Sequence, residues 1–323
     1  MRSPDVIALV GSSATGKTAV AEIVAMETGG EVVCADSRQV FRELEIGTGK
    51  PAPAERVRGA HHLFEALSIA AYAPGAEGGA NPAPRATAGW YARAAAGVCD
   101  EVRSRGRTPI LVGGSGLYLR AAERGLAPTP DVDPEVRARL HRELSENGLA
   151  VLRARLDRVD PASARAIHPS DAQRTLRALE VAEATGHPIG WWRSRPPIAA
   201  VAGTWRRFEL TAAPAELRER VSSRTRWMFA NGLIEETRAL SMSGHEDALE
   251  RLRAIGYDEA LAHLAGRMTR AEAEERTTLR TLQLAKRQRT WFRHQIETET
   301  LESGNRAPGE LAALVLERLA RAG

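Results

Sequence analysis

The strongest structural signal in the chain is the segment VIALVGSSATGKT, at residues 6–18. It begins with an apolar run of five residues, which is typical of a buried strand. The eight residues that follow match the phosphate-loop pattern G-x-x-x-x-G-K-[ST], and a helical pattern extends from residue 18 to residue 28. The segment therefore predicts a strand, a phosphate-binding loop and a helix.

This loop predicts both an anion site and a metal ligand. Its glycines let backbone N–H groups turn toward a phosphate, and the helix N-terminus adds a partial positive charge. Lys17 supplies a compact cation, and the Thr18 hydroxyl suits Mg²⁺, which we expect as cofactor. We expect phosphate to be held by Gly11, Ser12, Ser13, Ala14, Thr15, Gly16, Lys17 and Thr18. The loop leaves the reaction open, since a kinase, a nucleotide-dependent switch and a transferase with a diphosphate leaving group all fit.

Further strand patterns predict the fold class. They occur at residues 31–35, 109–112 and 205–211 and alternate with helical patterns. Such alternation predicts an α/β fold with a parallel sheet flanked by helices, like that of the P-loop NTPases. Residues 72–89 are rich in Ala, Gly and Pro, without periodicity, and predict a surface loop.

A helical subdomain is predicted to interrupt this core. Leucines recur at helical spacing between about Asp131 and Pro197, and Asp133-Pro134 is typical of a helix start. We expect a first core segment at 1–128, an all-helical insertion at 129–200, and the rest of the core with C-terminal helices at 201–323.

A carboxylate follows the second predicted strand. Asp36 would lie at the carboxyl edge of a parallel sheet, where ligands bind in such folds. It fits a general base, a Mg²⁺ ligand, or a plain helix N-cap. The third strand ends in Gly113-Gly114-Ser115 without an acid, which disfavours an ATPase or switch.

Composition excludes several classes of protein. The chain has 323 residues, 43% hydrophobic and 27% charged, as expected of a folded globular protein. No apolar run approaches the ~20 residues that cross a bilayer, and the run at 6–10 is too short for a signal peptide. We therefore expect a cytoplasmic protein without membrane contact, and a monomer. Of 45 basic residues, only Lys17, Lys50 and Lys286 are lysines. We therefore expect a specific reason why arginine is not used at each of these three positions.

Several segments, taken together, resemble the bacterial tRNA dimethylallyltransferase (tRNA isopentenyltransferase) family. They occur in the family's order and reach to about residue 293. The matching segments are GSSATGKT at 11–18, ADSRQVF at 35–41, IGTGKP at 46–51, GAHHLFE at 59–65, ILVGGSGLYL at 110–119, AIHPSDAQRTLRALEV at 166–181, RAIGYDEAL at 253–261 and LAKRQRTWFR at 284–293.

The resemblance implies an activity and a set of site residues. A dimethylallyl group would pass from dimethylallyl diphosphate to N6 of an adenosine next to the tRNA anticodon, releasing diphosphate. By position, Asp36 matches the general base, and Lys17, Thr18, Ser115 and Arg224 match groups around the diphosphate. The residues that would face tRNA, in the insertion and beside the base, are Asp36, Ser37, Arg38, Gln39, Gln173, Arg174, Thr175, Leu176 and Arg177. The alternatives are an adenylate isopentenyltransferase, a P-loop kinase of small molecules, and an RNA-binding switch.

A basic helix is a second candidate RNA surface. The helical pattern from about Ala271 to His294 has no acid after Glu275, and Lys286, Arg289 and Arg293 share one face. Such a face can bind phosphates. Trp191 and Trp192, near two arginines, fit either stacking on bases or packing in the protein.

Reversing the charge at both Lys286 and Arg289 tests this surface. We expect the apparent KM for tRNA to rise and its salt dependence to weaken, because two phosphate contacts would be lost. Steady-state kinetics at several salt concentrations measure both quantities. An unaltered KM and salt slope would show that this face does not bind RNA.

Overall fold

The chain folds into two units. The computed structural model describes residues 5–56, 59–76 and 84–321. Unit 1 comprises Met1–Glu123 and Val201–Gly323, and unit 2 comprises Arg124–Ala200. The insertion thus begins at residue 124, where the sequence analysis placed its start at 129.

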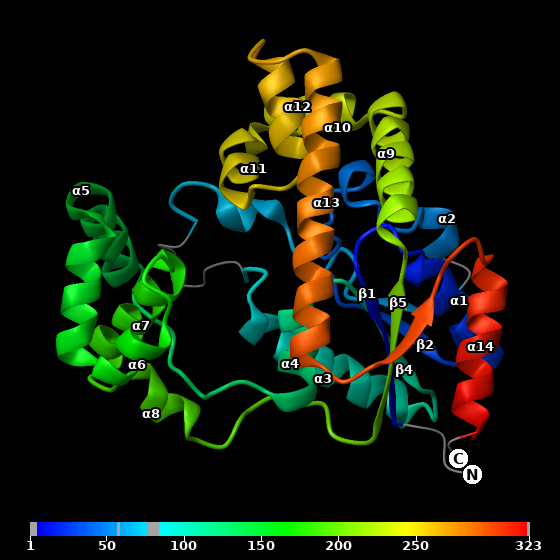
Figure 1. Ribbon diagram of the computed structural model, residues 1–323, viewed down its shortest axis with the longest axis horizontal. Coiled ribbons are helices and arrows are strands. Elements are labelled where there is room, and N and C mark those ends of the chain that lie inside the picture. Colours follow the sequence, from blue (N-terminus) through cyan, green and yellow to red (C-terminus); the bar gives the residue numbers. More distant parts are fainter. Residues whose placement is uncertain (1–4, 57–58, 77–83, 322–323) are drawn as a thin grey trace. The chain divides into compact units, whose positions relative to one another are not determined.

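Unit 1 is built on a six-stranded, all-parallel sheet in the order β3-β2-β4-β1-β5-β6 (Figure 1). The strands are β1 Val6–Gly11, β2 Glu31–Cys34, β3 His61–His62, β4 Pro109–Gly113, β5 Trp205–Thr211 and β6 Glu299–Glu302. The four predicted strands are present. Strands β3 and β6 were not predicted, because β3 has two residues and Leu301 is the one buried residue of β6. Neither strand therefore carries an apolar run.

Helices cover both faces of the sheet, as predicted. Ile7 and Leu9 of β1 pack on one side with α1 (Lys17–Thr28) and α14 (Pro308–Arg321). The alternate residues Ala8 and Val10 pack on the other side, in a core that includes residues of α3 (Ala88–Ser104). Because side chains alternate across a strand, a strand that is apolar throughout requires both layers. The architecture is a P-loop-like α/β fold.

The remaining helices of unit 1 complete the second layer and the carboxyl edge of the sheet. They are α2 Pro53–Arg56, α4 Gly116–Arg124, α9 Pro214–Ala230, α10 Leu233–Leu240, α11 Glu246–Leu252, α12 Tyr257–Leu264 and α13 Arg270–Gln295, with short turns at Ile46–Thr48, Ile69–Tyr72 and Ser241–His245. The long helix predicted from residue 271 to 294 is α13, which packs against α9 and α12 (Figure 1). Of the predicted loop at 72–89, residues 77–83 lie outside the described residues, and α3 begins at Ala88.

Unit 2 is helical, as the leucine spacing predicted. Its helices are α5 Pro134–Val159, α6 Pro161–Ala166, α7 Ala172–Thr185 and α8 Ile189–Arg193. Helix α5 starts where predicted, with the Asp133 carboxylate accepting the Glu135 N–H at 2.8 Å, and it kinks at Gly148. The unit has its own apolar core, which contains Leu140, Leu152, Leu156, Leu176 and Leu179.

Two further findings concern the cysteines and the helices. Cys34 and Cys99 are buried and unpaired with each other, as small apolar residues would be. Within residues 5–56, 59–76 and 84–321, every helix is too short or too polar to span a bilayer.

Helix α14 packs on α1, the helix that begins at the phosphate loop. Substitution of Leu311 tests that packing. Leu311 is buried in the core shared by α14 and α1. We expect Leu311→Ala to lower the free energy of unfolding by about 2–5 kcal/mol, as buried leucine truncations do. Leu279→Ala is the matched control, because Leu279 is 53% exposed on α13 and its loss should cost under about 0.5 kcal/mol. Denaturant titration measures both, and equal losses would contradict the packing.

Candidate active site

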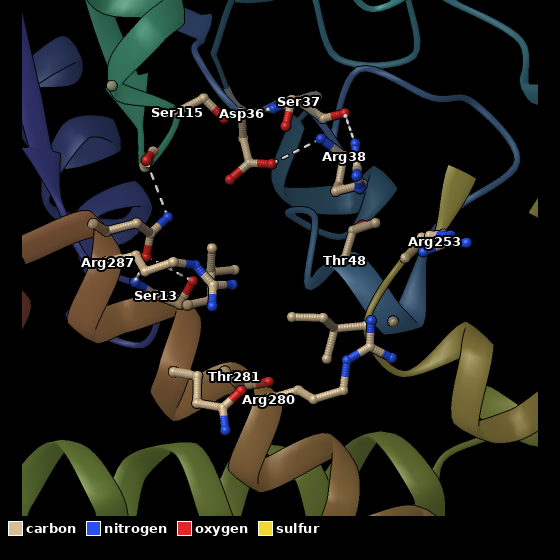
Figure 2. Close-up of a pocket in the computed structure, with 18 of the residues that line it drawn as sticks. Ser13, Asp36, Ser37, Arg38, Thr48, Ser115, Arg253, Arg280, Thr281 and Arg287 are labelled. Carbon is tan, nitrogen blue, oxygen red and sulfur yellow. Dashed lines mark hydrogen bonds between the residues drawn. The ribbon is translucent and has the colours of Figure 1, made fainter. Parts of the chain in front are cut away.

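One cavity in unit 1 is lined by three of the four predicted catalytic residues, whereas Lys17 and Thr18 are not among its lining residues. It has a volume of about 810 Å³ and lies at the carboxyl edge of the sheet, where β1, β2 and β4 end. Asp36, Ser115 and Arg224 line it together with Ser13 of the phosphate loop. In Figure 2 the Asp36 carboxylate points into this cavity, with Arg280 and Thr281 across from it.

The phosphate loop has the backbone that its sequence requires. Ala14 and Gly16 take left-handed conformations, with φ of 65° and 82°. The Lys17 ammonium group folds back over the loop and donates to the Ser12 carbonyl at 2.6 Å. Burial, with a smaller effect from Arg224, lowers the pKa of Lys17 to about 8, against the opposing effect of Asp36. Lys17 is thus a poorly solvated cation, which an anion in the loop would stabilise.

Asp36 is fixed by its neighbours in a turn. One oxygen of its carboxylate accepts the Arg38 N–H at 2.9 Å. The Ser115 hydroxyl accepts the Ser37 N–H at 2.9 Å, and the Ser115 N–H donates to the Ala35 carbonyl. Asp36 therefore caps a turn and not a helix, and Ser115 ties that turn to the end of β4.

Arg224 brings a second cation to the same place. Its guanidinium donates to the Thr48 carbonyl at 2.9 Å, and Gln39 donates to the same carbonyl at 3.2 Å. Burial lowers the pKa of Arg224, and Asp36 opposes this shift. Since the pKa of Lys17 responds to both Asp36 and Arg224, the three charges lie within each other's field. The structure thus places Asp36 and Arg224 in the lining of one cavity, and Lys17 within range of both charges.

Gln288 of α13 was missed by the sequence analysis. Its side-chain oxygen accepts the Ser13 N–H at 2.9 Å, and its side-chain nitrogen donates to the Gly114 carbonyl at 3.0 Å. It therefore joins the phosphate loop to the end of β4. The sequence does not show which face of this helix turns toward the site. The residues of α13 that line the cavity are Thr277, Arg280, Thr281, Gln283, Leu284, Arg287, Gln288, Trp291 and Phe292.

The predicted basic face of α13 lies elsewhere on the helix. Lys286 and Arg289 do not line the cavity, and Lys286 and Arg293 are exposed. Phe292 is buried and Trp291 lines the cavity, so the aromatic residues do pack inward. The sequence identified the helix, but adjacent basic residues on two faces do not reveal which face turns toward the site.

In unit 2, the five residues predicted to face tRNA form the first turns of α7. Gln173 and Arg174 are exposed, and Arg177 is half-buried beside Glu180, at 3.4 Å. Thr175 and Leu176 are buried inside the unit, which corrects the prediction that they contact RNA. Their burial follows from helical geometry, because they lie on the side of α7 that packs on the core of unit 2.

The tryptophan pair of unit 2 is also structural. Trp192 packs on the core and its indole N–H donates to Thr185 at 3.0 Å. The His187 ring stacks on Trp191 at 4.1 Å, and the Arg195 guanidinium carbon lies 3.8 Å from the Trp191 ring centroid. Trp191 thus packs against two planar groups of its own unit.

Comparison with known proteins identifies similar chains over the whole length. The family model described as IPP transferase matches residues 39–295, and that described as isopentenyl transferase matches residues 4–64. The tRNA dimethylallyltransferase of Stenotrophomonas maltophilia (strain K279a) is 38% identical over 326 residues, covering 97% of this chain and 98% of that one. The enzyme of the same name from Streptomyces coelicolor is 40% identical over 319 residues, covering 99% and 97%.

Solved structures show the same similarity. The full-length tRNA isopentenylpyrophosphate transferase of Bacillus halodurans has a TM-score of 0.67 and 29% identity, covering 98% of this chain and 97% of that one. A eukaryotic dimethylallyltransferase acting on tRNA has a TM-score of 0.78 at 22% identity, covering 98% and 79%, and shares the fold.

The lowered pKa of Lys17 predicts how anion binding depends on pH. An anion prefers the protonated lysine, so affinity for inorganic pyrophosphate should fall as the pH rises through about 8, approaching tenfold per pH unit above it. Lys17→Ala should bind more weakly at pH 7, by about 1.5–3 kcal/mol, and retain only the titration of pyrophosphate itself. Calorimetry from pH 7 to pH 9.5 on both proteins measures this. Parallel pH profiles would contradict the assignment of Lys17.

Proposed function

The chain belongs to the IPP transferase family, whose members compared above are tRNA dimethylallyltransferases, and we propose that its cavity transfers a dimethylallyl group from dimethylallyl diphosphate to N6 of an adenosine next to the anticodon of tRNA. The chain is thus a prenyltransferase that modifies tRNA. The observation that supports the proposed site best is a carboxylate, Asp36, pointing into the cavity that Arg224 and Ser13 of the phosphate loop also line.

The proposed donor site stabilises a leaving group. As the bond between the allylic carbon and the diphosphate oxygen breaks, negative charge grows on diphosphate, and Lys17, Arg224 and the loop N–H groups stabilise it. Buried donors interact more strongly with developing charge than solvated ones do. The burial of both cations is therefore part of their role.

The proposed acceptor chemistry uses Asp36 as a general base. N6 of adenosine forms a bond to the allylic carbon while diphosphate departs, and the N6 proton passes to the Asp36 carboxylate. Such a base contributes ~10²–10⁴-fold to the rate. Arg38 and Ser115, which fix the turn around Asp36, hold the carboxylate in place.

Magnesium is a further proposal. Thr18 offers one neutral oxygen at the first turn of α1, and no cluster of three His, Cys, Asp or Glu suited to a metal occurs in the part of the chain that the structure describes. This donor set fits Mg²⁺ held by Thr18, diphosphate oxygens and water, a mode in which few protein ligands are needed. When bound, Mg²⁺ would neutralise part of the diphosphate charge.

The tRNA partner is proposed to bind through its anticodon loop. A base in a loop leaves its stack at a cost of a few kcal/mol, less than a paired base. Arg253 and Arg287 line the cavity and provide positive charge for the phosphates around that base, whereas Arg280 is paired with Asp258 and Glu259. Gln173 and Arg174 are exposed on unit 2 and remain proposed tRNA contacts. We propose that the enzyme acts as a monomer in the cytoplasm.

One assay tests the activity against its alternatives. The protein is incubated with unmodified tRNA and dimethylallyl diphosphate, without ATP, and the digested nucleosides are analysed by mass. Dimethylallyladenosine supports the proposal. Prenylation of free adenylate in place of tRNA would identify an adenylate isopentenyltransferase, and ATP-dependent phosphorylation of a metabolite would identify a kinase.

Asp36→Asn tests the general base. We expect tRNA binding to persist while turnover falls by ~10²–10⁴-fold, because the amide cannot accept the N6 proton. Asp247→Asn is the control, since Asp247 is exposed on α11 and lies outside the cavity lining. Filter binding and single-turnover kinetics measure the two effects, and turnover like that of the unmodified enzyme would remove Asp36 from this role.

A further inference from the structure

The short turn Ile46–Thr48, within the IGTGKP motif, is held at its N-terminal end by two side chains, the buried Tyr257 and the half-buried Glu236. The Glu236 carboxylate accepts the Glu45 N–H at 3.0 Å and the Ile46 N–H at 2.8 Å. The Tyr257 hydroxyl accepts the Gly47 N–H at 3.2 Å. Three successive backbone N–H groups are thus bound by residues of α10 and α12.

The two side chains also bind each other. The Tyr257 hydroxyl donates to Glu236, and the Tyr257 side chain is fully buried. The hydroxyl therefore uses both its donor and an acceptor position, and removing it would leave the Gly47 N–H and one carboxylate oxygen of Glu236 without this partner. Such a pair fixes the turn more firmly than loop contacts exposed to water would.

The other end of the turn holds Arg224. The Thr48 carbonyl accepts from the Arg224 guanidinium at 2.9 Å. A Cβ atom at Gly49 would overlap that guanidinium, and one at Gly47 would overlap the Tyr257 ring. The two glycines therefore let the turn fit between Tyr257 on one side and Arg224 on the other.

Lys50 anchors the chain just after the turn. Its side chain is fully buried, and its ammonium group donates to the Phe41 carbonyl at 2.9 Å and to Glu45 at 3.0 Å. A second carboxylate, Glu65, lies 3.4 Å away. These acceptors surround a single nitrogen, an arrangement that a compact ammonium satisfies and a planar guanidinium does not. The turn is thus held on both flanks.

We propose that Tyr257 and Glu236 are positioning residues for Arg224, acting through the Ile46–Thr48 turn. By binding the N–H groups of the turn, they set the position of the Thr48 carbonyl, which orients the guanidinium in the cavity. This inference rests on the proposed role of Arg224 at the diphosphate. It assigns a function to a motif that itself carries no reacting group.

A double-mutant cycle on pyrophosphate binding tests this coupling. Tyr257→Phe should weaken binding about three- to tenfold in the otherwise unmodified enzyme and have no effect in the Arg224→Ala background, because its influence passes through Arg224. Calorimetry measures the four dissociation constants. The kcat/KM for dimethylallyl diphosphate should show the same pattern.

Tyr91→Phe is the matched control. Tyr91 is fully buried, lies outside the cavity lining, and its hydroxyl has no hydrogen-bond partner among the described residues. Removing that hydroxyl should leave pyrophosphate binding unchanged. Should Tyr257→Phe fail to fold, Glu236→Gln serves in its place, since one side-chain oxygen still accepts a backbone N–H.

Two outcomes would overturn the inference. Either Tyr257→Phe binds pyrophosphate like the unmodified enzyme, or its penalty persists in the Arg224→Ala background. Failure of the proposed function has a different signature, in which the unmodified enzyme makes no prenylated tRNA although the coupling between Tyr257 and Arg224 is still measured with pyrophosphate.

Discussion

Lys17 and Arg224 lie partly buried beside a single carboxylate, Asp36, and this excess of positive charge constrains the rest of the site. Burial lowers the pKa of both cations, and Asp36 is the group that opposes the shift in each case. A diphosphate would reverse the balance, because its charge exceeds that of one carboxylate. In the proposed complex, Asp36 would lie beside both the cations and the diphosphate, so the charge of the ligand would act on the proposed base as well as on the proposed donor site.

Holding such charges in place requires contacts from distant parts of the chain. The phosphate loop comes from the N-terminal segment, but Gln288 of α13 binds its Ser13 N–H and ties it to the end of β4. Arg224 comes from α9 and is held by the turn before Lys50. The helices that follow β5 therefore form a scaffold for the site, and the P-loop segment alone would not assemble it.

The sequence predicted the features that depend on local pattern. The strand, loop and helix at residues 6–28, the helix start at Asp133 and the long helix now seen as α13 follow from hydrophobic period and capping chemistry, and the structure has them. The sequence did not predict the contacts of Gln288 or Glu236. Each side chain binds a residue 174 or 191 positions away, and the sequence around a polar helix residue does not show such a partner. Strand β6 was missed for a related reason, since it is an edge strand whose pairing with β5 is set by the tertiary fold. The burial of Thr175 and Leu176 could have been predicted from the helical period of this segment. It was missed because all five residues of the family motif were assigned together as tRNA contacts.

The scarcity of lysine in the sequence can be related to the geometry around each lysine in the structure. Lys50 is fully buried where three acceptors surround one nitrogen, whereas Lys17 makes one such contact within the phosphate loop. Lys17 curls back to the Ser12 carbonyl within the loop, and Lys50 is surrounded by a carbonyl and two carboxylates. A planar guanidinium cannot place its donors on three acceptors gathered around one point, so the buried site of Lys50 requires a compact ammonium. Lys286 is exposed, and nothing in the structure explains why arginine does not stand there. Among the three lysines, then, the surrounding acceptors require lysine most clearly at Lys50, and Lys17 uses its compact ammonium for the contact within the phosphate loop.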